Sequence, residues 1–329
     1  MSKKSPHHRK RMLPRLTELP PRTMTEVTRR EYRSFRESHN EVEIESSKVL
    51  LSGPWTVKAV GPPQEYKPER TTVWSFPDRG DWATHSGTYR GNWSPYIPRN
   101  LILRYTKPGD LVLDQMVGSG TTLVECRLLG RRAIGVDVNP DAVMVARDRL
   151  NFSFHSLDAS FEEPDIKTYV GDARNLDLVP DESVDLVATH PPYAGIVAYS
   201  NGRVQGDISA SRGVGEFISQ IVEIARESYR VLKDGGHCAI LMGDTRRHRH
   251  FVPISTRVLQ AFLDVGFVIR EDVIKIQWKM KSTRERWSGS KYDFLLLAHE
   301  HLFVFRKLVA GEPRSPLRDS SSWWAKPSA

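Results

Sequence analysis

Three aspartates stand where predicted strands end, and their positions could serve a ligand that carries hydroxyl and amino groups. Asp114, Asp137 and Asp172 each close a short apolar run. The carboxyl ends of parallel strands meet at one crevice of a sheet, so the three carboxylates should gather there. Asp137 could accept hydrogen bonds from ribose hydroxyls, and Asp172 could accept one from an adenine amine. The acids therefore predict a nucleoside site.

A glycine-rich turn joins the first of these strands to a predicted helix. Residues 114–122 read Asp-Gln-Met-Val-Gly-Ser-Gly-Thr-Thr, and the glycines allow a sharp turn close to a ligand. A dinucleotide would favour a third glycine beside its pyrophosphate, but Leu123 stands in that place. S-adenosylmethionine has no phosphate, so it is the predicted cofactor; the plain alternative is a tight turn with incidental acids. The predicted cofactor-binding residues are Asp114, Gln115, Met116, Gly118, Gly120, Thr121, Asp137, Asp172 and Ala173.

A second motif, Thr189-His190-Pro191-Pro192-Tyr193, follows the fourth predicted strand. The two prolines fix the turn and leave a carbonyl exposed. A neutral imidazole offers one acceptor nitrogen, whereas a protonated imidazole offers none. Taken alone, the segment fits a rigid loop with a surface histidine as well as it fits a reactive site.

Together these motifs resemble those of a known family. Residues 114–122 resemble the Asp-Pro-Phe-x-Gly-Ser-Gly-Thr-Thr segment of the DNA amino-methyltransferases of restriction–modification systems, with Gln115 and Met116 replacing Pro-Phe. Residues 93–102 resemble the segment that covers the methionine end of the cofactor in that family. Residues 190–193 resemble its Asp/Asn/Ser-Pro-Pro-Tyr motif. The resemblance extends over residues 93–307 and is strongest in the glycine and Pro-Pro-Tyr motifs.

The resemblance implies roles for four catalytic residues. The His190 side chain and the Pro191 carbonyl would accept the two N–H groups of an exocyclic base amine, and Pro192 would help to fix the turn. Tyr193 would stack on the target base, which must be flipped out of a duplex. Because His190 can accept a hydrogen bond only when it is neutral, methyl transfer should fall as the pH drops through about 6 to 7.

The motifs leave the target base open. Family members with Ser-Pro-Pro-Tyr mostly modify N4 of cytosine, and a neutral acceptor at His190 favours that atom over N6 of adenine. Two further hypotheses are a base amine of RNA (tRNA) as the target and an inactive paralogue that only binds nucleic acid. Methylation at carbon 5 of cytosine is excluded, because it needs a cysteine beside a proline and neither Cys126 nor Cys238 has one.

Strands that alternate with helices must position these motifs. The pattern predicts a Rossmann-like α/β fold of the class I methyltransferase type, with a doubly wound, mostly parallel sheet. The two last strands have no helix between them and should form an antiparallel pair. The predicted strands span residues 111–116, 133–138, 184–189, 238–242, 268–277 and 294–306, a further strand ends near Gly171, and the predicted helices span 121–129, 140–150, 215–232 and 253–265.

Four segments make up the predicted domain organisation. Residues 1–50 are expected to be a basic flexible arm with a helix near residues 25–38, and residues 51–92 an irregular extension. The methyltransferase domain should occupy residues 93–310, followed by a tail over residues 311–329.

The basic charge of the chain favours a nucleic-acid partner. The net charge is +8, and residues 1–36 hold eleven Lys or Arg against three Glu, which suits a polyanion. Duplex DNA with base flipping is the predicted partner, and RNA is the alternative. The candidate contact residues lie in two basic segments: Arg246, Arg247, Lys279, Lys281, Arg284 and Arg286.

Other classes of protein are not supported. No apolar run is long enough to cross a membrane, and no secretory signal is evident. No Cys/His cluster has metal-ligand spacing, and the two cysteines suit a reducing compartment. We expect a cytoplasmic, nucleoid-associated protein without a metal.

Overall fold

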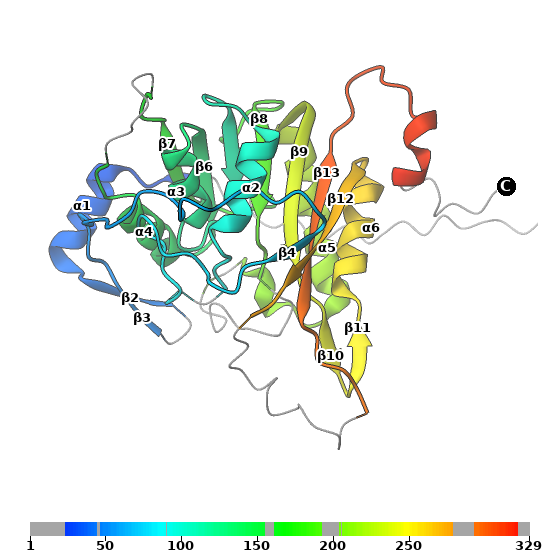
Figure 1. The fold of residues 1–329 in the computed structure, drawn as a ribbon, viewed down its shortest axis with the longest axis horizontal. Coiled ribbons are helices and arrows are strands. Elements are labelled where there is room, and N and C mark those ends of the chain that lie inside the picture. Colours follow the sequence, from blue (N-terminus) through cyan, green and yellow to red (C-terminus); the bar gives the residue numbers. More distant parts are fainter. Residues whose placement is uncertain are drawn as a thin grey trace, which may run out of the picture.

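A long mixed sheet runs through the molecule (Figure 1). The computed structural model describes residues 24–44, 47–89, 91–154, 161–192, 204, 206–278 and 293–321. In these ranges the sheet has nine strands. Their order is β1 (Thr25–Glu26), β7 (Ile166–Val170), β6 (Arg132–Asp137), β5 (Leu111–Asp114), β8 (Val184–Thr189), β9 (Leu232–Met242), β13 (His299–Arg306), β12 (Val268–Ile276) and β4 (Val73–Ser75).

Strand directions match the predicted fold class. The five strands from β7 to β9 are parallel to one another, whereas β13 is antiparallel to both β9 and β12. Parallel strands need crossover connections, which the helices supply. β12 (Val268–Ile276) and β13 (His299–Arg306) have no such helix between them in the described ranges, and they pair antiparallel. The predicted doubly wound sheet with an antiparallel C-terminal pair is confirmed.

Helices cover both faces of the sheet (Figure 1). Successive side chains of a strand point to opposite faces, so Val112 and Leu113 of β5 enter different cores. The Val112 core includes residues of α2 (Tyr96–Tyr105), α3 (Thr121–Leu128) and the end of α4 (Pro140–Arg149). The Leu113 core includes α5 (Val214–Val231) and α6 (Ile254–Val265). Because helices cover both faces, the ends of the strands are where a site can open.

The N-terminal segment differs from the expected flexible arm, because residues 24–44 and 47–50 fold onto the core. β1 pairs with β7 at the sheet edge. The predicted helix is α1 (Arg29–Ser38), which Thr28 and Glu31 cap reciprocally. A hairpin of β2 (Glu41–Ile44) and β3 (Ser47–Leu50) packs against α4. Most of the basic surplus, seven Lys or Arg against one Glu, belongs to residues 1–23, which lie outside the described ranges.

Three smaller elements occur in the described ranges. The basic run after β9 forms a hairpin of β10 (Thr245–Arg247) and β11 (His250–Val252). Within the described part of the expected tail, η3 (Ser315–Ser320) is a short 3₁₀ helix. A second 3₁₀ turn, η1 (Ile208–Ala210), precedes α5. Among the helices in the described ranges, none has the length and apolar character that crossing a membrane requires.

Candidate active site

A cleft of about 910 Å³, counted to its open mouth, lies at the carboxyl ends of β5, β6, β7 and β8. Seven of the predicted cofactor residues line it: Asp114, Gln115, Met116, Gly118, Asp137, Asp172 and Ala173. His190 and Pro192 line the same cleft. Gly120, Thr121 and Pro191 are not part of its lining, and Tyr193 lies outside the described residues. The two predicted motifs therefore meet in one place.

Asp114 connects the two motifs instead of facing solvent. Its carboxylate accepts hydrogen bonds from the Met116 backbone N–H (3.2 Å), from the Thr122 hydroxyl and from the Thr189 hydroxyl (3.1 Å). Burial, with only 3% of the residue exposed, raises the pKa of Asp114 to about 7. Thr189 directly precedes His190, so Asp114 fixes the glycine turn against the strand that carries the histidine.

Asp137 shapes the turn from the neighbouring strand. Its two carboxylate oxygens accept from the backbone N–H of Gly118 (2.9 Å) and of Asn139 (3.0 Å). Burial raises the pKa of Asp137 to about 6. Each carboxylate oxygen can accept more than one hydrogen bond, so Asp137 keeps capacity for ligand hydroxyls.

The glycine turn uses conformations that only glycine adopts readily. Gly118 and Gly120 have φ values of +50° and +82°, in the region that disfavours side chains. A Cβ on Gly120 would also lie 3.0 Å from the Ala146 Cβ on α4. The Gln115 amide donates to the Ser228 hydroxyl (2.9 Å) in the core, and the Thr121 hydroxyl donates to Asn92. These two side chains serve the protein fold, which the sequence did not indicate.

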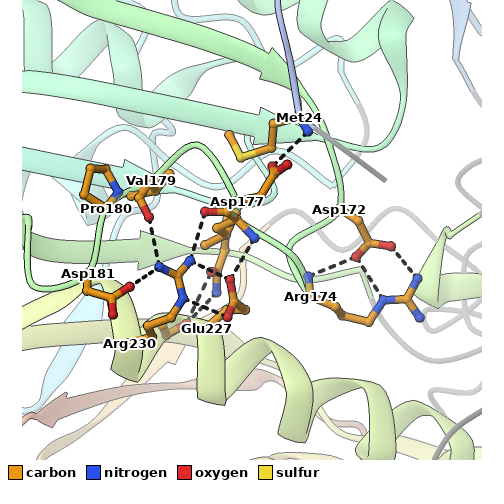
Figure 2. A network of polar contacts seen from close by, with 12 residues as sticks. Met24, Asp172, Arg174, Asp177, Val179, Pro180, Asp181, Glu227 and Arg230 are labelled. Atoms are coloured by element: carbon orange, nitrogen blue, oxygen red, sulfur yellow. Dashed lines mark hydrogen bonds and ion pairs between the residues drawn. The ribbon is translucent and has the colours of Figure 1, made fainter. Parts of the chain in front are cut away.

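Asp172 is bound by a neighbouring arginine (Figure 2). Arg174 donates to Asp172 Oδ1 from its backbone N–H (3.0 Å) and from Nε (2.9 Å), and its terminal nitrogen lies 2.5 Å from Oδ2. The same figure shows Arg230 and Glu227 of α5 holding the following segment, with Arg230 donating to the Val179 carbonyl at 3.0 Å. The predicted acceptor of an adenine amine is thus already engaged in this arrangement.

His190 lies in an environment that keeps its ring neutral. The ring stacks on Trp93, with centroids 5.9 Å apart and an interplanar angle of 19°. Burial lowers the pKa of His190 to about 4; the positive charges of Lys275 and Arg79 act in the same direction, and Glu300 opposes them. The predicted loss of the acceptor at pH 6 to 7 therefore does not fit this environment, because the imidazole stays neutral well below that range.

Sequence reasoning missed several residues of the cleft. Tyr89, Asn92 and Trp93 form part of its wall; of these, only Trp93 lay in a segment with a recognised resemblance. Asp207 also lines the cleft, yet it follows no strand, so no strand-end signal marks it. An acid in a loop becomes a candidate only when the fold brings it beside the other acids.

The predicted nucleic-acid contacts are only partly within the described residues. Arg246 donates to the carbonyls of Leu295 (3.1 Å) and Arg249 (3.0 Å), so its guanidinium fastens the β10–β11 hairpin. Arg247 on the same hairpin is exposed. The other four candidates, Lys279, Lys281, Arg284 and Arg286, lie outside the described residues. Within the described ranges, no group of three or more His, Cys, Asp or Glu side chains is arranged to hold a metal.

Comparison with known proteins identifies the family. A family profile described as DNA methylase, of the N6/N4 amino-methyltransferase type, matches residues 4–148 and 184–314. A general methyltransferase-domain profile matches residues 113–191. The first match covers well over half of the chain.

Individual relatives are similar over shorter stretches. The chain is 28% identical to the type II methyltransferase M.MjaI of Methanocaldococcus jannaschii, over 48% of this chain and 61% of that protein. It is 38% identical to M.Cfr9I of Citrobacter freundii over 25% and 26%. It is 37% identical to a tRNA (guanine(10)-N2)-dimethyltransferase of Methanothermobacter thermautotrophicus over 35% and 31%.

The chain thus spans less than two thirds of the length of these relatives. The acids and the glycine turn of the cleft also suit a nucleoside without phosphates, because they offer hydrogen-bond acceptors and a close backbone but no cationic cradle. The chain belongs to the N6/N4 DNA methylase family, and its cofactor is S-adenosylmethionine.

Proposed function

We propose that the chain transfers the methyl group of S-adenosylmethionine to an exocyclic amine of a base in duplex DNA, at N4 of cytosine. The observation that carries this proposal is the neutral state of His190, which directly precedes Pro191-Pro192 and lines the cofactor cleft. A neutral imidazole is a hydrogen-bond acceptor at physiological pH, which is the property that an amine substrate requires.

The role of this acceptor follows from the chemistry of the amine. The lone pair of an exocyclic base nitrogen is delocalised into the ring, so the nitrogen is a poor nucleophile. His190 and the Pro191 carbonyl accept hydrogen bonds from the two N–H groups and draw the nitrogen towards a tetrahedral shape, which frees the lone pair. Pro192 fixes the turn, and Tyr193 stacks on the flipped base. The cofactor, when bound, would supply an electrophilic methyl group. Its carbon–sulfur bond breaks as the nitrogen–carbon bond forms, so that S-adenosylhomocysteine leaves and the amine gives up one proton to the solvent.

The cofactor roles follow from the contacts of each acid. Asp137 accepts hydrogen bonds from ribose hydroxyls, because its oxygens can accept further hydrogen bonds besides those from two backbone N–H groups. Gly118, Met116 and Ala173 line the cleft beside it and offer backbone contacts. Asp114 and Thr121 position the turn. Asp172 keeps its predicted place near the adenine, although its contact with Arg174 limits its free acceptors.

Cytosine is preferred over adenine because of the first residue of the catalytic motif. Family members that carry serine in this place mostly modify N4 of cytosine, and His190, like serine, is an uncharged hydrogen-bond acceptor. Relatives with an aspartate or asparagine there more often modify N6 of adenine. N6 of adenine is thus the alternative within the same chemistry.

An RNA substrate is the second candidate function. It is favoured by one observation, the 37% identity over 115 residues to a tRNA (guanine(10)-N2)-dimethyltransferase. The amine chemistry would be the same, with a guanine or adenine amine as the target. The relatives named as type II methyltransferases make DNA the leading proposal.

Basic parts of the chain are the proposed DNA contacts. They comprise residues 1–23, the exposed Arg247, and the Lys279, Lys281, Arg284 and Arg286 segment, with Arg246 supporting the hairpin. Such charges neutralise phosphates without reading the sequence. We place the protein with the nucleoid in the cytoplasm, and we assign residues 93–310 as the methyltransferase domain, onto which residues 24–44 and 47–50 fold.

The test is transfer of tritium from labelled S-adenosylmethionine to duplex DNA, single-stranded DNA and tRNA offered separately at equal nucleotide concentration. The proposal predicts incorporation into duplex DNA above the other two acceptors. Incorporation confined to tRNA would support the RNA candidate instead. The absence of label in all three acceptors, with S-adenosylhomocysteine still bound, would contradict both.

A further inference from the structure

A fourth acid, Asp207, lines the cleft, although it does not follow a strand and the sequence pattern did not predict it. Asp207 caps the 3₁₀ turn η1 (Ile208–Ala210), between the catalytic motif and α5. It lies in the wall of the same cleft as Asp114, Asp137 and Asp172. Its position in this wall raises the question of what its carboxylate binds.

The two oxygens of Asp207 differ in their surroundings. Oδ1 accepts the backbone N–H of Ser209 at 2.8 Å, which is an ordinary capping contact. Oδ2 is buried and has no hydrogen-bond partner among the residues that the structure describes. A buried charged acceptor without a donor is costly. A bound ligand that brings an N–H or O–H group into the cleft would remove that cost.

Asp207 lies close to the two acids that were predicted to bind the nucleoside, Asp137 and Asp172. The negative charge of Asp207 adds to the burial that raises the pKa of Asp137, so the two carboxylates are close enough to interact. Arg174 donates to Gln220 at 3.0 Å and to the Gly206 carbonyl at 3.4 Å, besides binding Asp172. Arg174 thereby joins the predicted adenine acceptor to the segment that carries Asp207.

Asp172 and Asp207 therefore differ in how many hydrogen-bond donors their carboxylates receive. The oxygens of Asp172 receive three donors from Arg174, whereas one oxygen of Asp207 receives none from the described residues. An acceptor for a nucleoside donor is thus better supplied by Asp207 than by Asp172. The charge of Asp172 serves to hold Arg174 in place.

We propose that Asp207 is a cofactor-binding residue whose Oδ2 accepts a hydrogen bond from the nucleoside part of S-adenosylmethionine, either a ribose hydroxyl or the adenine amine. The inference depends on the cofactor assignment and is independent of the nucleic-acid substrate. Asp207 then takes part of the role that sequence reasoning gave to Asp172.

The experiment measures equilibrium binding of S-adenosylhomocysteine by calorimetry to the wild type and to Asp207→Asn. Asparagine caps a helical turn as well as aspartate does, but it cannot offer two acceptor oxygens. The expected result is a loss of affinity of about 10- to 100-fold. Asp181→Asn is the matched control, because the side chain of Asp181 is 73% exposed and Asp181 is not among the cleft residues.

Two further ligands assign the contact. 5′-Methylthioadenosine contains the nucleoside without the amino acid, so its affinity should fall by the same factor in Asp207→Asn. S-inosylhomocysteine lacks the adenine amine. A loss of affinity for this analogue in Asp207→Asn identifies a ribose hydroxyl as the donor, whereas no loss identifies the amine; both results support the proposal.

Two outcomes would overturn the proposal. One is binding of S-adenosylhomocysteine by Asp207→Asn within twofold of the wild type. The other is a loss for S-adenosylhomocysteine without a loss for 5′-methylthioadenosine, which would move the contact to the amino-acid end. Asp207→Ser, which also keeps a capping oxygen, repeats the test if the asparagine variant folds poorly. Failure of the wild type to bind would instead contradict the cofactor assignment.

Discussion

The acids and the histidine of the cleft respond to burial in opposite directions. Among the acids, burial raises the pKa of Asp114 to about 7 and that of Asp137 to about 6. Burial lowers the pKa of His190 to about 4. In each case burial favours the neutral form. The acids approach the point where they lose acceptor capacity on acidification, whereas the histidine retains it.

The contacts of the acids and of the histidine also differ. Backbone N–H groups and hydroxyls hold Asp114 and Asp137, whereas a stacked ring, Trp93, lies against His190. Under the proposed function, the acids bind the cofactor and His190 accepts a hydrogen bond from the amine. Substitutions of the acids and of His190 should therefore have separable effects on binding and on turnover.

Replacement of His190 should give the largest effect. His190→Phe keeps a ring that can stack on Trp93 but removes the acceptor, so the single-turnover rate at saturating cofactor should fall about 100-fold or more. His190→Gln keeps a neutral acceptor and should retain more of the rate. S-adenosylhomocysteine affinity should change by less than about threefold in both variants.

His237→Phe is the matched control for this substitution. Burial also lowers the pKa of His237 to about 4, but its ring packs against Tyr105 and it is not among the residues that line the cleft. Wild-type rates are expected. A fully active His190→Phe protein would rule out the acceptor role of His190.

Asp137→Asn should chiefly weaken cofactor binding. The amide replaces one acceptor with a donor that faces the N–H of Gly118 or Asn139, so S-adenosylhomocysteine affinity should fall about 10- to 100-fold. Asp172→Asn should lose less, because Arg174 already occupies that carboxylate. Calorimetry compares the two. A larger loss in Asp172→Asn would mean that Asp172 binds the ligand directly.

The raised pKa of Asp114 predicts a pH-dependent stability. An ordinary aspartate titrates near pH 4, but folded Asp114 titrates at about 7. The folded state therefore keeps a proton that the unfolded chain has released, so this group's contribution to stability falls as the pH rises from about 4 to about 7. Asp114→Asn, which has no titrating group there, should lose about 5 °C less in melting temperature than the wild type between pH 5 and pH 8. Equal losses in both proteins would contradict the assigned pKa.

Arg247→Ala should give the smallest effect. Arg247 is exposed on the β10–β11 hairpin, so its loss should weaken duplex DNA binding a few-fold and reduce the slope of log affinity against log salt by about one. Filter binding or anisotropy at several salt concentrations measures both. Arg270→Ala, which removes an arginine of β12, serves as a control. An unchanged slope in Arg247→Ala would exclude a phosphate contact at this position.

The sequence predicted much of the core because its strands are short, apolar and bounded by turns. The predicted bounds of β8 agree with the structure at both ends. β9, in contrast, begins at Leu232 instead of 238, because its polar Lys-Asp-Gly-Gly segment contains an irregular register between its pairs with Val184 and Leu186. Such a bulge adds polar residues and glycine to a strand and hides it from pattern reading.

The site could be located from sequence more readily than its contacts could be assigned. Asp114 reaches Thr189, 75 residues away, and Gln115 reaches Ser228, 113 residues away; neither pairing leaves a local signal. Arg174 lies only two residues from Asp172, but an i, i+2 contact depends on the turn that brings the side chains together. Near the N-terminus the helix α1 was predicted, but its attachment to the core was not, because pairing of β1 with β7 and packing of the β2–β3 hairpin on α4 join residues far apart in the sequence.

Identification of the atom that receives the methyl group is the most direct test of the proposed chemistry. Duplex DNA labelled by the wild-type protein would be digested to nucleosides and identified by mass spectrometry. The expected result is an exocyclic N-methyl product, N4-methylcytidine in its deoxy form; N6-methyldeoxyadenosine would keep the amine chemistry and change the base. Label found as 5-methyldeoxycytidine would contradict the role of His190 and the Pro191-Pro192 turn.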